Sequence, residues 1–484
     1  MSQNITNVTR QRSLCVFADW LATFCAFFCF NVFRFYYMNL GEAYRHLANF
    51  LLSPKLIAEQ LAVPVILLFV YWISGYYNKP FEKSRLNEFL ITLYSQLFNA
   101  VAIYLGALTN DQLFLRRENW MLLLILFGLL FFFTYFERLL MTHSLIRRLK
   151  KMDVRPRTIL VGVSQESKLL AKKLDNSNIK PNATVVGVMP FETDNDDCFR
   201  DEGFENIPRI KDLDELKKLC SEKRVDQIII IPPEGKFTSS EILFLLYHLF
   251  PFDISIKIKP DILSIVTPSI RLQDIMEEPF VDLAYPQISE FSKNVKRTLD
   301  VAISTLGLII LSPLLASIAL GIKISGSGKV IYSQERIGIH RKPFRIYKFR
   351  SMVEEAEKDG IPLLSSDDDR RITRIGKWMR KYRLDELPQF WNVLKGDMSI
   401  VGPRPERDYF IDKIVNKAPW YTLVLQVRPG ITSWGMVKYG YATDIDQMIE
   451  RNRYDLIYLA NMSMAVDFKI LLHTIKTVGA GKGK

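Results

Sequence analysis

Four long apolar segments in the first 145 residues constrain the fold of this chain more than any other feature. Each is about 20 residues long, the length that an α-helix needs to cross the hydrocarbon core of a bilayer. The first has arginines before it and no small-residue cleavage site after it, so we expect a retained span and keep a secretory signal as the weaker alternative. The sequence therefore predicts a membrane protein with a four-helix transmembrane bundle over residues 1–150. The predicted spans are Leu14–Phe35, Ile57–Tyr77, Phe89–Leu108 and Trp120–Met141.

Basic residues in the connections predict the orientation of the bundle. Lys79–Arg85 lies between the second and third spans and Arg147–Lys151 follows the fourth, and cytoplasmic segments carry an excess of Lys and Arg. This places the N-terminus and everything after the fourth span in the cytoplasm. An exporter is a weaker alternative, because it would need ionisable residues deep within the spans, and those of the four predicted spans lie near their ends. They are Asp19, Arg34, Glu59, Glu137 and Arg138.

The pattern changes to alternating strand and helix signals over residues 151–270. Apolar β-branched runs at Thr158–Val163, Thr184–Met189 and Gln227–Ile231 predict a small Rossmann-like α/β domain with a parallel sheet. The turn Gly162–Ser167 lacks the second and third glycines of a dinucleotide-binding motif, so backbone cannot approach a pyrophosphate closely. We expect a spacer, regulatory or dimerising role here, with residues 271–292 as a linker.

A second type of membrane segment is predicted at residues 298–324. The apolar run Val301–Ile322 is long enough to cross a bilayer, but Ser312 and Pro313 interrupt it at the middle and cations flank both ends. The run is therefore predicted to enter the cytoplasmic leaflet, bend at the proline and return, rather than to form a Pro-kinked fifth span.

The residues whose side chains best suit catalysis lie between Lys381 and Pro405. Asp385 and Glu386 precede Pro388, which is tolerated only in the first turn of a helix. The spacing predicts a short helix with Asp385 near its N-cap and Gly396 just past its end. Unpaired amides at such an N-terminus suit a phosphate. The predicted buried face of this helix is Leu387, Phe390, Trp391 and Leu394.

Cations flank the acid pair on both sides. Arg380, Lys381 and Arg383 precede it, and Arg404 follows it in a rigid Gly-Pro-Arg-Pro turn. Carboxylates among cations suit phosphoryl chemistry, in which one carboxylate attacks or holds a metal. The simpler interpretation is an N-cap and an exposed first-turn acid. Upstream, period-2 spacing puts Lys348 and Arg350 on one strand face, where they bind phosphate or protect an edge strand.

Three stretches then resemble a known family, the monotopic phosphoglycosyl transferases, which are bacterial sugar transferases. The resemblance covers about residues 293–484 and implies a catalytic domain there, compact and α/β, with the re-entrant helix at its start. Two departures are Asp369–Thr373, where members usually have DPRIT, and Thr432–Gly440, where they have TGWxQVxGR. The stretches that match are Arg380 with Leu384–Gln389, Asn392–Pro405 and Tyr347–Met352.

The resemblance implies transfer of a sugar 1-phosphate from a UDP-sugar to a polyprenyl phosphate, with release of UMP, at the start of exopolysaccharide, capsule or O-antigen synthesis. It implies Asp385 as the nucleophile and Glu386 as a ligand of Mg²⁺. Asp455 and Asp467 fall where members carry acids in the last helical segments. The phosphate-binding cations are expected to be Arg380, Arg404, Arg350, Lys348 and Arg383.

The remaining expectations concern partners. The net charge of +12 suits anionic lipid and anionic substrates, and nothing else in the sequence supports nucleic acid. We expect a homodimer in the bacterial inner membrane with its catalytic domain on the cytoplasmic face. The alternative is a non-catalytic membrane scaffold that senses a nucleotide. An enzyme is expected to stay active when residues 1–285 are removed, whereas a sensor is not. No motif identifies the sugar.

Overall fold

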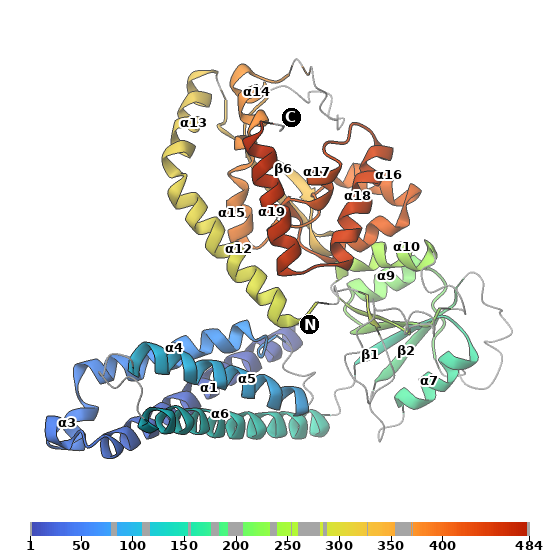
Figure 1. The fold of residues 1–484 in the computed structure, drawn as a ribbon. Coiled ribbons are helices and arrows are strands. Elements are labelled where there is room, and N and C mark those ends of the chain that lie inside the picture. The colour runs from blue at the N-terminus through green and yellow to red at the C-terminus, as the bar shows by residue number, and fades with distance from the viewer. Residues whose placement is uncertain are drawn as a thin grey trace. The chain divides into compact units, whose positions relative to one another are not determined.

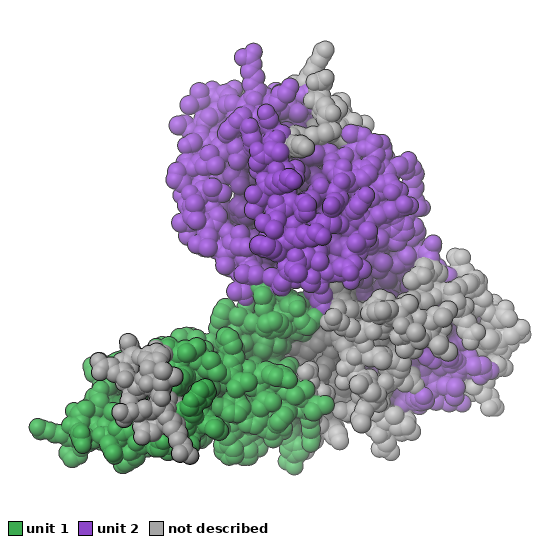
Figure 2. Space-filling view, in the orientation of Figure 1, with its two compact units in different colours: residues 1–154, 289–295 green, residues 155–288, 296–484 purple. Residues whose placement is uncertain are grey.

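The chain folds into two compact units (Figures 1 and 2). One unit contains residues 1–154 and 289–295, and the other contains residues 155–288 and 296–484. The computed structural model describes residues 2–78, 85–108, 117–152, 156–175, 183–191, 207–232, 240–252, 254–259, 281–283, 288–326, 328–353, 369 and 371–481.

Four long apolar helices form the first unit, as predicted. The long helix α1 packs against both α4 and α6, and α5 packs against α6. By length and composition the spans are Arg12–Tyr37, Pro54–Ile73, Glu88–Gly106 and Trp120–Ser144. The helices of this unit are α1 (Ser2–Tyr37), α2 (Gly41–Tyr44), α3 (Leu47–Leu51), α4 (Pro54–Ile73), α5 (Arg85–Ile103), the π-helical turn η1 (Tyr104–Leu108) and α6 (Arg117–Met152).

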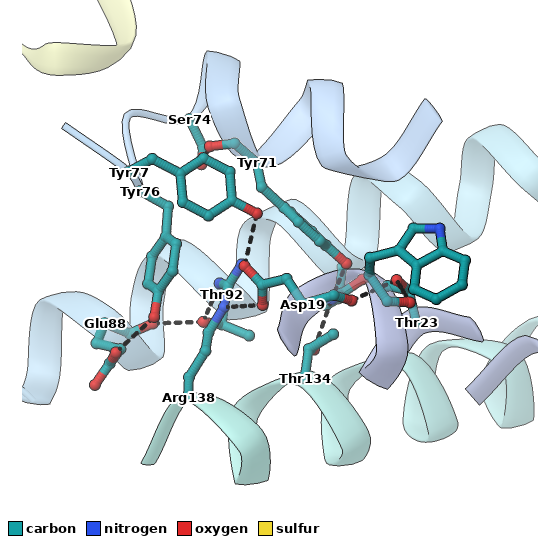
Figure 3. A network of polar contacts seen from close by, with 12 residues as sticks. Asp19, Thr23, Tyr71, Ser74, Tyr76, Tyr77, Glu88, Thr92, Thr134 and Arg138 are labelled. Atoms are coloured by element: carbon teal, nitrogen blue, oxygen red, sulfur yellow. Dashed lines mark hydrogen bonds and ion pairs between the residues drawn. The ribbon is translucent and has the colours of Figure 1, made fainter. Parts of the chain in front are cut away.

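A buried arginine connects all four long helices of this unit (Figure 3). Arg138 of α6 donates to both carboxylate oxygens of Asp19 in α1, at 2.9 and 3.1 Å, and to the hydroxyl of Thr92 in α5 at 2.7 Å. Its guanidinium carbon also lies 4.6 Å from the ring centre of Tyr71 in α4. A buried charge is tolerated where it is paired and hydrogen-bonded, so Arg138 with Asp19 fixes the packing of the bundle.

Glu88 extends this polar network. Its Oε1 atom accepts hydrogen bonds of 2.9 Å from the hydroxyls of Tyr76 and Thr142, and its side chain is buried. Glu88 lies one residue outside the predicted span that begins at Phe89, so the apolar pattern did not identify it. Glu88 lies in the first turn of α5, which agrees with the expectation that ionisable residues lie near the helix ends, and interhelical hydrogen bonds compensate its buried carboxylate.

The first unit also includes the start of a later helix, α12 (Glu290–Ile310). The side-chain amide of Asn78 donates to Glu290 at 2.7 Å, and that of Asn294 donates to the carbonyl of Trp72 at 2.6 Å. A Cβ on Gly75 would lie 2.6 Å from Cβ of Glu290, so only glycine permits this approach. The predicted linker over residues 271–292 is therefore wrong at its end, because Glu290 already belongs to a packed helix.

The second unit begins with the predicted α/β domain. Its five-stranded sheet has the order β2-β1-β3-β4-β5, in which the first four strands are parallel and β5 is antiparallel. The strand β5 lies within the predicted linker, and it pairs with β4 at the edge of the sheet. The elements are β1 (Arg157–Val161), α7 (Gln165–Asp175), β2 (Thr184–Met189), α9 (Leu213–Ser221), β3 (Gln227–Ile230), α10 (Ser240–Leu249), η3 (Phe250–Phe252), β4 (Ser255–Ile258) and β5 (Val281–Asp282).

Polar and steric features of the β1–α7 turn argue against a pyrophosphate at this place. Gly162 has φ of +107°, and a Cβ there would lie 2.2 Å from the carbonyl oxygen of Ile231, so the glycine serves strand packing. The amide of Ser167 donates to the hydroxyl of Ser164, and the hydroxyl of Ser167 accepts from the amide of Ser164. These two serines satisfy the start of α7 internally.

The rest of the second unit surrounds two small sheets. Strands β6 and β7 form an antiparallel hairpin that pairs Ile331 with Phe349, and β8 and β9 pair in parallel. The elements are α12, α13 (Ser312–Ile324), β6 (Ile331–Ile337), η4 (Ile339–Arg341), β7 (Pro343–Phe349), α14 (Arg374–Lys381), η5 (Leu384–Glu386), α15 (Gln389–Lys395), β8 (Ser399–Val401), α16 (Asp408–Lys417), η6 (Pro419–Gln426), β9 (Gly430–Thr432), α17 (Trp434–Lys438), α18 (Ile445–Ala460) and α19 (Met464–Gly479).

The α/β domain and this second part of the unit share one hydrophobic core. Ile228 and Leu246 of the α/β domain belong to the same buried cluster as Phe410 and Tyr421. Polar contacts reinforce the junction: the hydroxyl of Tyr247 in α10 donates to Asp412 in α16 at 2.6 Å. The two parts are therefore packed together as a domain core is, rather than joined by a flexible connection.

Candidate active site

The two predicted site acids lie next to each other in one turn of 3₁₀ helix, η5, and both are buried. Arg383 precedes the turn and has a left-handed backbone conformation with φ of 53°. The amide of Glu386 donates to the carbonyl of Arg383 at 3.2 Å. This turn therefore fixes the backbone that carries Asp385 and Glu386.

The helix after the acid pair begins later than the sequence predicts. Pro388 is its N-cap residue, and α15 runs from Gln389 to Lys395. The predicted N-cap position of Asp385 is therefore wrong, and so is the prediction of free amides there, because the amide of Glu386 is used within the preceding turn. Gly396 follows the helix with φ of 94°, which agrees with the prediction.

The buried face of α15 also differs from the prediction. Trp391, from the predicted apolar face, is 55% exposed, whereas Asn392 and Val393 are buried. The side chain of Asn392 donates to the carbonyl of Arg345 at 2.7 Å and accepts from the amide of Tyr347 at 3.0 Å. The apolar period is therefore correct only in part: the other three predicted residues are partly buried, and hydrogen bonds to strand β7 place Asn392 on the fully buried side.

Three cations surround the carboxylate of Glu386. Nζ of Lys348 donates to Oε1 at 2.8 Å, and Nη2 of Arg404 lies 3.5 Å from the same oxygen. Nη1 of Arg383 lies 3.5 Å from Oε2. Lys348 comes from β7 and Arg404 from the turn after β8, so the fold brings three of the predicted cations to one carboxylate.

Burial and neighbouring charges shift the pKa values of the two acids in opposite directions. Burial raises the pKa of Asp385 above its usual value; the positive charge of Lys348 opposes this, and the charge of Glu386 adds to it. Burial also acts to raise the pKa of Glu386, but Lys348, Arg404 and Arg383 together hold it well below the usual range. Two neighbouring acids with pKa values moved in opposite directions are typical of catalytic pairs.

Arg380 lies on the Asp385 side of the site. Its Nε atom donates to the hydroxyl of Ser351 at 2.9 Å, and its charge is one of those that lower the pKa of Asp385. No hydrogen bond or ion pair joins the carboxylate of Asp385 to another side chain in the described part of the chain. Asp385 is therefore the less constrained of the two acids.

Arg350 does not face Glu386. Its Nη2 atom lies 3.3 Å from the carbonyl of Gly326 and 3.5 Å from that of Ile322, at the C-terminal end of α13. The two cations of the predicted pair therefore contact different partners: Lys348 lies within β7 and reaches Glu386, whereas Arg350 directly follows the last residue of the strand, Phe349.

The turn that carries Arg404 is held closely against strand β9. A Cβ on Gly402 would lie 2.4 Å from the carbonyl oxygen of Arg428, so a larger residue cannot occupy this position without displacing backbone. The amide of Gly430 donates to the carbonyl of Pro403 at 2.8 Å. The sequence predicts this rigid turn, which fixes the backbone position from which the side chain of Arg404 extends.

Buried charges behind the turn stabilise it further. Glu406 is paired with Arg451 of α18 at 2.5 Å and with Arg336 of β6 at 3.4 Å. Asp455 of α18 accepts from the amide of Gly435 at 2.8 Å. Arg451 and Arg336 were not predicted from the sequence, since residues far apart in the chain form these pairs.

Helix α12 is joined to the rest of the unit by two basic side chains. Arg297 donates to the carbonyls of Val393 and Leu394 at the end of α15, at 2.6 and 3.0 Å. Lys296 binds Asp467 at 2.6 Å, so this predicted acid holds α12 to α19. These contacts fix the apolar helix relative to the acid pair.

The apolar helix is broken where the sequence predicts. Helix α12 ends at Ile310, α13 begins at Ser312 with Pro313 in its first turn, and the two bend by 62°. Both carry exposed apolar side chains, among them Ile310 at 70% and Ile324 at 77%. Such a surface is expected to contact lipid or protein, and the bend suits a segment that enters and leaves one leaflet.

The acid pair is compatible with Mg²⁺ but not with a metal site built from protein alone. Within the described residues, no three His, Cys, Asp or Glu side chains are grouped so as to hold a metal. Mg²⁺ is usually held by one or two carboxylates together with substrate phosphates. Asp385 and Glu386 provide such carboxylates. Among the described residues, Oε2 of Glu386 contacts only Arg383, at 3.5 Å, and a metal ion can replace this long contact.

Comparison with known proteins finds a family match in the C-terminal part of the chain. Residues 291–481 match the family model described as bacterial sugar transferase. An N-acetylgalactosaminephosphotransferase of Aeromonas hydrophila, named as acting on undecaprenyl phosphate, is 39% identical over 45% of this chain and 51% of its own length. The chain thus spans about half of that relative.

Two further relatives extend the comparison. A galactosyl transferase of Streptococcus agalactiae is 28% identical over 88% of this chain and 94% of its own. A UDP-glucose:undecaprenyl-phosphate glucose-1-phosphate transferase of Caulobacter vibrioides is 37% identical over 38% of this chain, and the match covers 69% of that relative. The chain therefore belongs to the bacterial sugar transferase family.

Proposed function

We propose that the chain transfers a sugar 1-phosphate from a UDP-sugar to polyprenyl phosphate, such as undecaprenyl phosphate, and releases UMP. One observation supports this more than any other: Asp385, whose carboxylate is bound to no other side chain among the described residues, lies beside Glu386, which three cations hold ionised. The names of the relatives from Aeromonas and Caulobacter include the same class of lipid acceptor. The site thus combines a nucleophile with a place for anionic substrate.

The reaction proceeds in two displacements at one phosphorus atom. A carboxylate oxygen of Asp385 attacks the phosphorus that bears the sugar, and the bond from this phosphorus to the oxygen bridging the two phosphates breaks, so UMP leaves with that oxygen. An oxygen of the lipid phosphate then attacks the same phosphorus, and the Asp385 carboxylate leaves. No proton needs to be transferred to or from Asp385, provided that its carboxylate is ionised at the start.

The cations stabilise the charge that develops during transfer. Lys348, Arg404 and Arg383 already surround Glu386, and Arg380 acts on Asp385. Charge-assisted hydrogen bonds from such groups to phosphoryl oxygens are stronger than neutral ones. A diphosphate that enters the site competes with Glu386 for these donors.

Glu386 would hold Mg²⁺ together with the phosphates of the donor. When bound, the ion neutralises charge on the diphosphate and makes UMP a better leaving group. Lys348, Arg404 and Arg383 keep Glu386 ionised over the whole physiological pH range. Its carboxylate is therefore charged whenever a metal ion binds.

The location of the reaction is the cytoplasmic face of the bacterial inner membrane. UDP-sugars are cytoplasmic, whereas a polyprenyl chain is buried in lipid, so the site must lie at the boundary. The bent pair of helices α12 and α13, fixed to the site through Arg297, supports this placement. The homodimer and the step in polysaccharide synthesis remain predictions from the sequence.

Purified protein, a panel of UDP-sugars, Mg²⁺ and a short polyprenyl phosphate test the proposal directly. We expect UMP to form with at least one UDP-sugar, and a lipid-linked sugar diphosphate to form in equal amount. Release of UDP instead of UMP would contradict the proposal, because it requires cleavage at the sugar carbon. No UMP with any donor would favour the alternative of a non-catalytic scaffold.

A further inference from the structure

Tyr441 ends an aromatic-rich stretch, Trp434–Tyr441, and lies beside the acid pair. Its ring centre is 5.3 Å from the guanidinium carbon of Arg383 and 5.7 Å from that of Arg404. These are two of the three cations that hold Glu386. One aromatic ring therefore contacts both guanidiniums at distances typical of cation–π interactions.

The chain before Tyr441 is built to fix its position. Helix α17 is capped by Ser433, whose hydroxyl accepts from the amide of Met436 at 3.0 Å. Gly440 then turns the chain with φ of +97°, and a Cβ there would meet nothing within 4 Å. The glycine is thus needed for its backbone conformation rather than for space. Tyr441 follows immediately after the segment Thr432–Gly440, which departs from the family pattern.

The hydroxyl of Tyr441 makes no hydrogen bond with any other described residue. The side chain is half-buried. Burial raises the pKa of the phenol and the charge of Glu386 adds to this effect, so at neutral pH the hydroxyl is protonated and can donate. A donor next to Arg383 and Arg404 lies in a positive environment, where the acceptor expected from a substrate is an anionic oxygen.

We propose that Tyr441 is a substrate-binding residue: its ring orients Arg383 and Arg404, and its hydroxyl donates a hydrogen bond to a phosphoryl oxygen of the donor's diphosphate. This inference rests on the proposed function, since it needs a diphosphate in the site. It assigns a role to the residue directly after the divergent segment Thr432–Gly440.

Two substitutions separate the ring from the hydroxyl. Tyr441→Phe keeps the ring over both guanidiniums and removes only the donor, whereas Tyr441→Leu removes the ring as well. A matched control is Tyr439→Phe, because Tyr439 is exposed and contacts Tyr454 instead, with ring centres 6.5 Å apart. Melting temperatures of all three proteins show whether each is folded.

The measurement is UMP release from each accepted UDP-sugar, with kcat and KM determined separately, and binding of UDP in the presence of Mg²⁺. We expect Tyr441→Phe to lower kcat/KM by roughly 10-fold or more, by the same factor for every sugar, as loss of a hydrogen bond to a charged group predicts. UDP binding should weaken in the same variant. Tyr441→Leu should lose more, and Tyr439→Phe should match the wild type.

Three results would overturn the inference. Wild-type kinetics and UDP binding in Tyr441→Phe would exclude the hydrogen bond. A loss confined to one sugar would place the hydroxyl against the sugar and not the phosphate. An equal loss in Tyr439→Phe would indicate a general effect of the segment. If the wild type releases no UMP from any donor, the proposed function itself fails, and the assignment of Tyr441 fails with it.

Discussion

Nζ of Lys348 lies 2.8 Å from Oε1 of Glu386, and this contact joins the β6–β7 hairpin to the turn that carries both acids. Because Lys348 is held in a strand and Glu386 in a 3₁₀ turn, neither group needs to reorganise when charge develops nearby. The same contact helps keep Glu386 ionised, which in turn raises the pKa of Asp385.

Glu386→Gln is therefore expected to shift the pH dependence of the reaction. In the proposed mechanism Asp385 reacts as the carboxylate, so UMP release should rise with pH through its raised pKa. Removing the negative charge of Glu386 lowers that pKa, and the acid limb of the profile should move to lower pH. Total activity should fall, because the ligand proposed for Mg²⁺ is weakened. An acid limb that moves to higher pH would contradict this electrostatic account.

Asp455→Asn is expected to remove a pH dependence of stability. Burial raises the pKa of Asp455 to about 6, with the hydrogen bond from Gly435 opposing this. The folded protein then binds a proton that the unfolded chain has already released, so the free energy of unfolding falls as pH rises from about 4 to about 6, by on the order of 3 kcal/mol, and is constant above.

Urea unfolding of the detergent-solubilised protein between pH 4 and pH 7.5 measures this effect. The Asn variant keeps an oxygen acceptor for the amide of Gly435, so its folded structure should persist. It should be more stable than the wild type at pH 7 and show a flatter profile over the same range. A parallel decline in both proteins would mean that other groups cause it.

Arg138→Met is expected to destabilise the transmembrane bundle. It leaves the carboxylate of Asp19 buried without its partner, a change that costs about 3 to 5 kcal/mol in buried ion pairs. Adding Asp19→Asn should recover much of the loss, since no isolated charge then remains. Melting temperatures in detergent for the single and double variants test this. A double variant no more stable than Arg138→Met would show that the pair is not coupled.

A fragment that begins at residue 286 is expected to fold poorly, in contrast to the sequence-based expectation that it remains active. The α/β domain covers Phe410, Ile414 and Tyr421, which lie in the core shared by the two parts. Removing the domain exposes this apolar surface, and aggregation should follow. Size-exclusion chromatography and thermal unfolding check the outcome. A monomeric fragment with the wild-type melting temperature would mean that the shared core contributes little.

The elements that the sequence predicts correctly are those with a long or strongly periodic signal. The four spans follow from their length, the strands β1, β2 and β3 from β-branched runs, and the bend of the apolar helix from Pro313. Lys348, Arg383 and Arg404 meet at Glu386, and two of these cations, Lys348 and Arg404, lie in the stretches that carry the family resemblance.

The errors concern contacts between residues that are distant in the chain. Asn392 determines the buried face of α15 through hydrogen bonds to β7, which no helical period reveals. Arg350 contacts the carbonyl of Gly326 after α13 and does not join Lys348 at Glu386. Glu88 is compatible with an apolar bundle only because Tyr76 and Thr142 donate to it. Local pattern predicts elements, whereas these side chains are placed by tertiary packing.

Single-turnover release of UMP by Asp385→Asn, with UDP-sugar and Mg²⁺ but without lipid acceptor, tests the central claim most directly. In the wild type we expect at most one UMP per enzyme molecule, with the sugar phosphate left on the protein and detectable as an increase in its mass. Asparagine has almost the same shape as aspartate but provides no carboxylate nucleophile, so the variant should release none. Release of UMP by Asp385→Asn at a rate near that of the wild type would contradict the account.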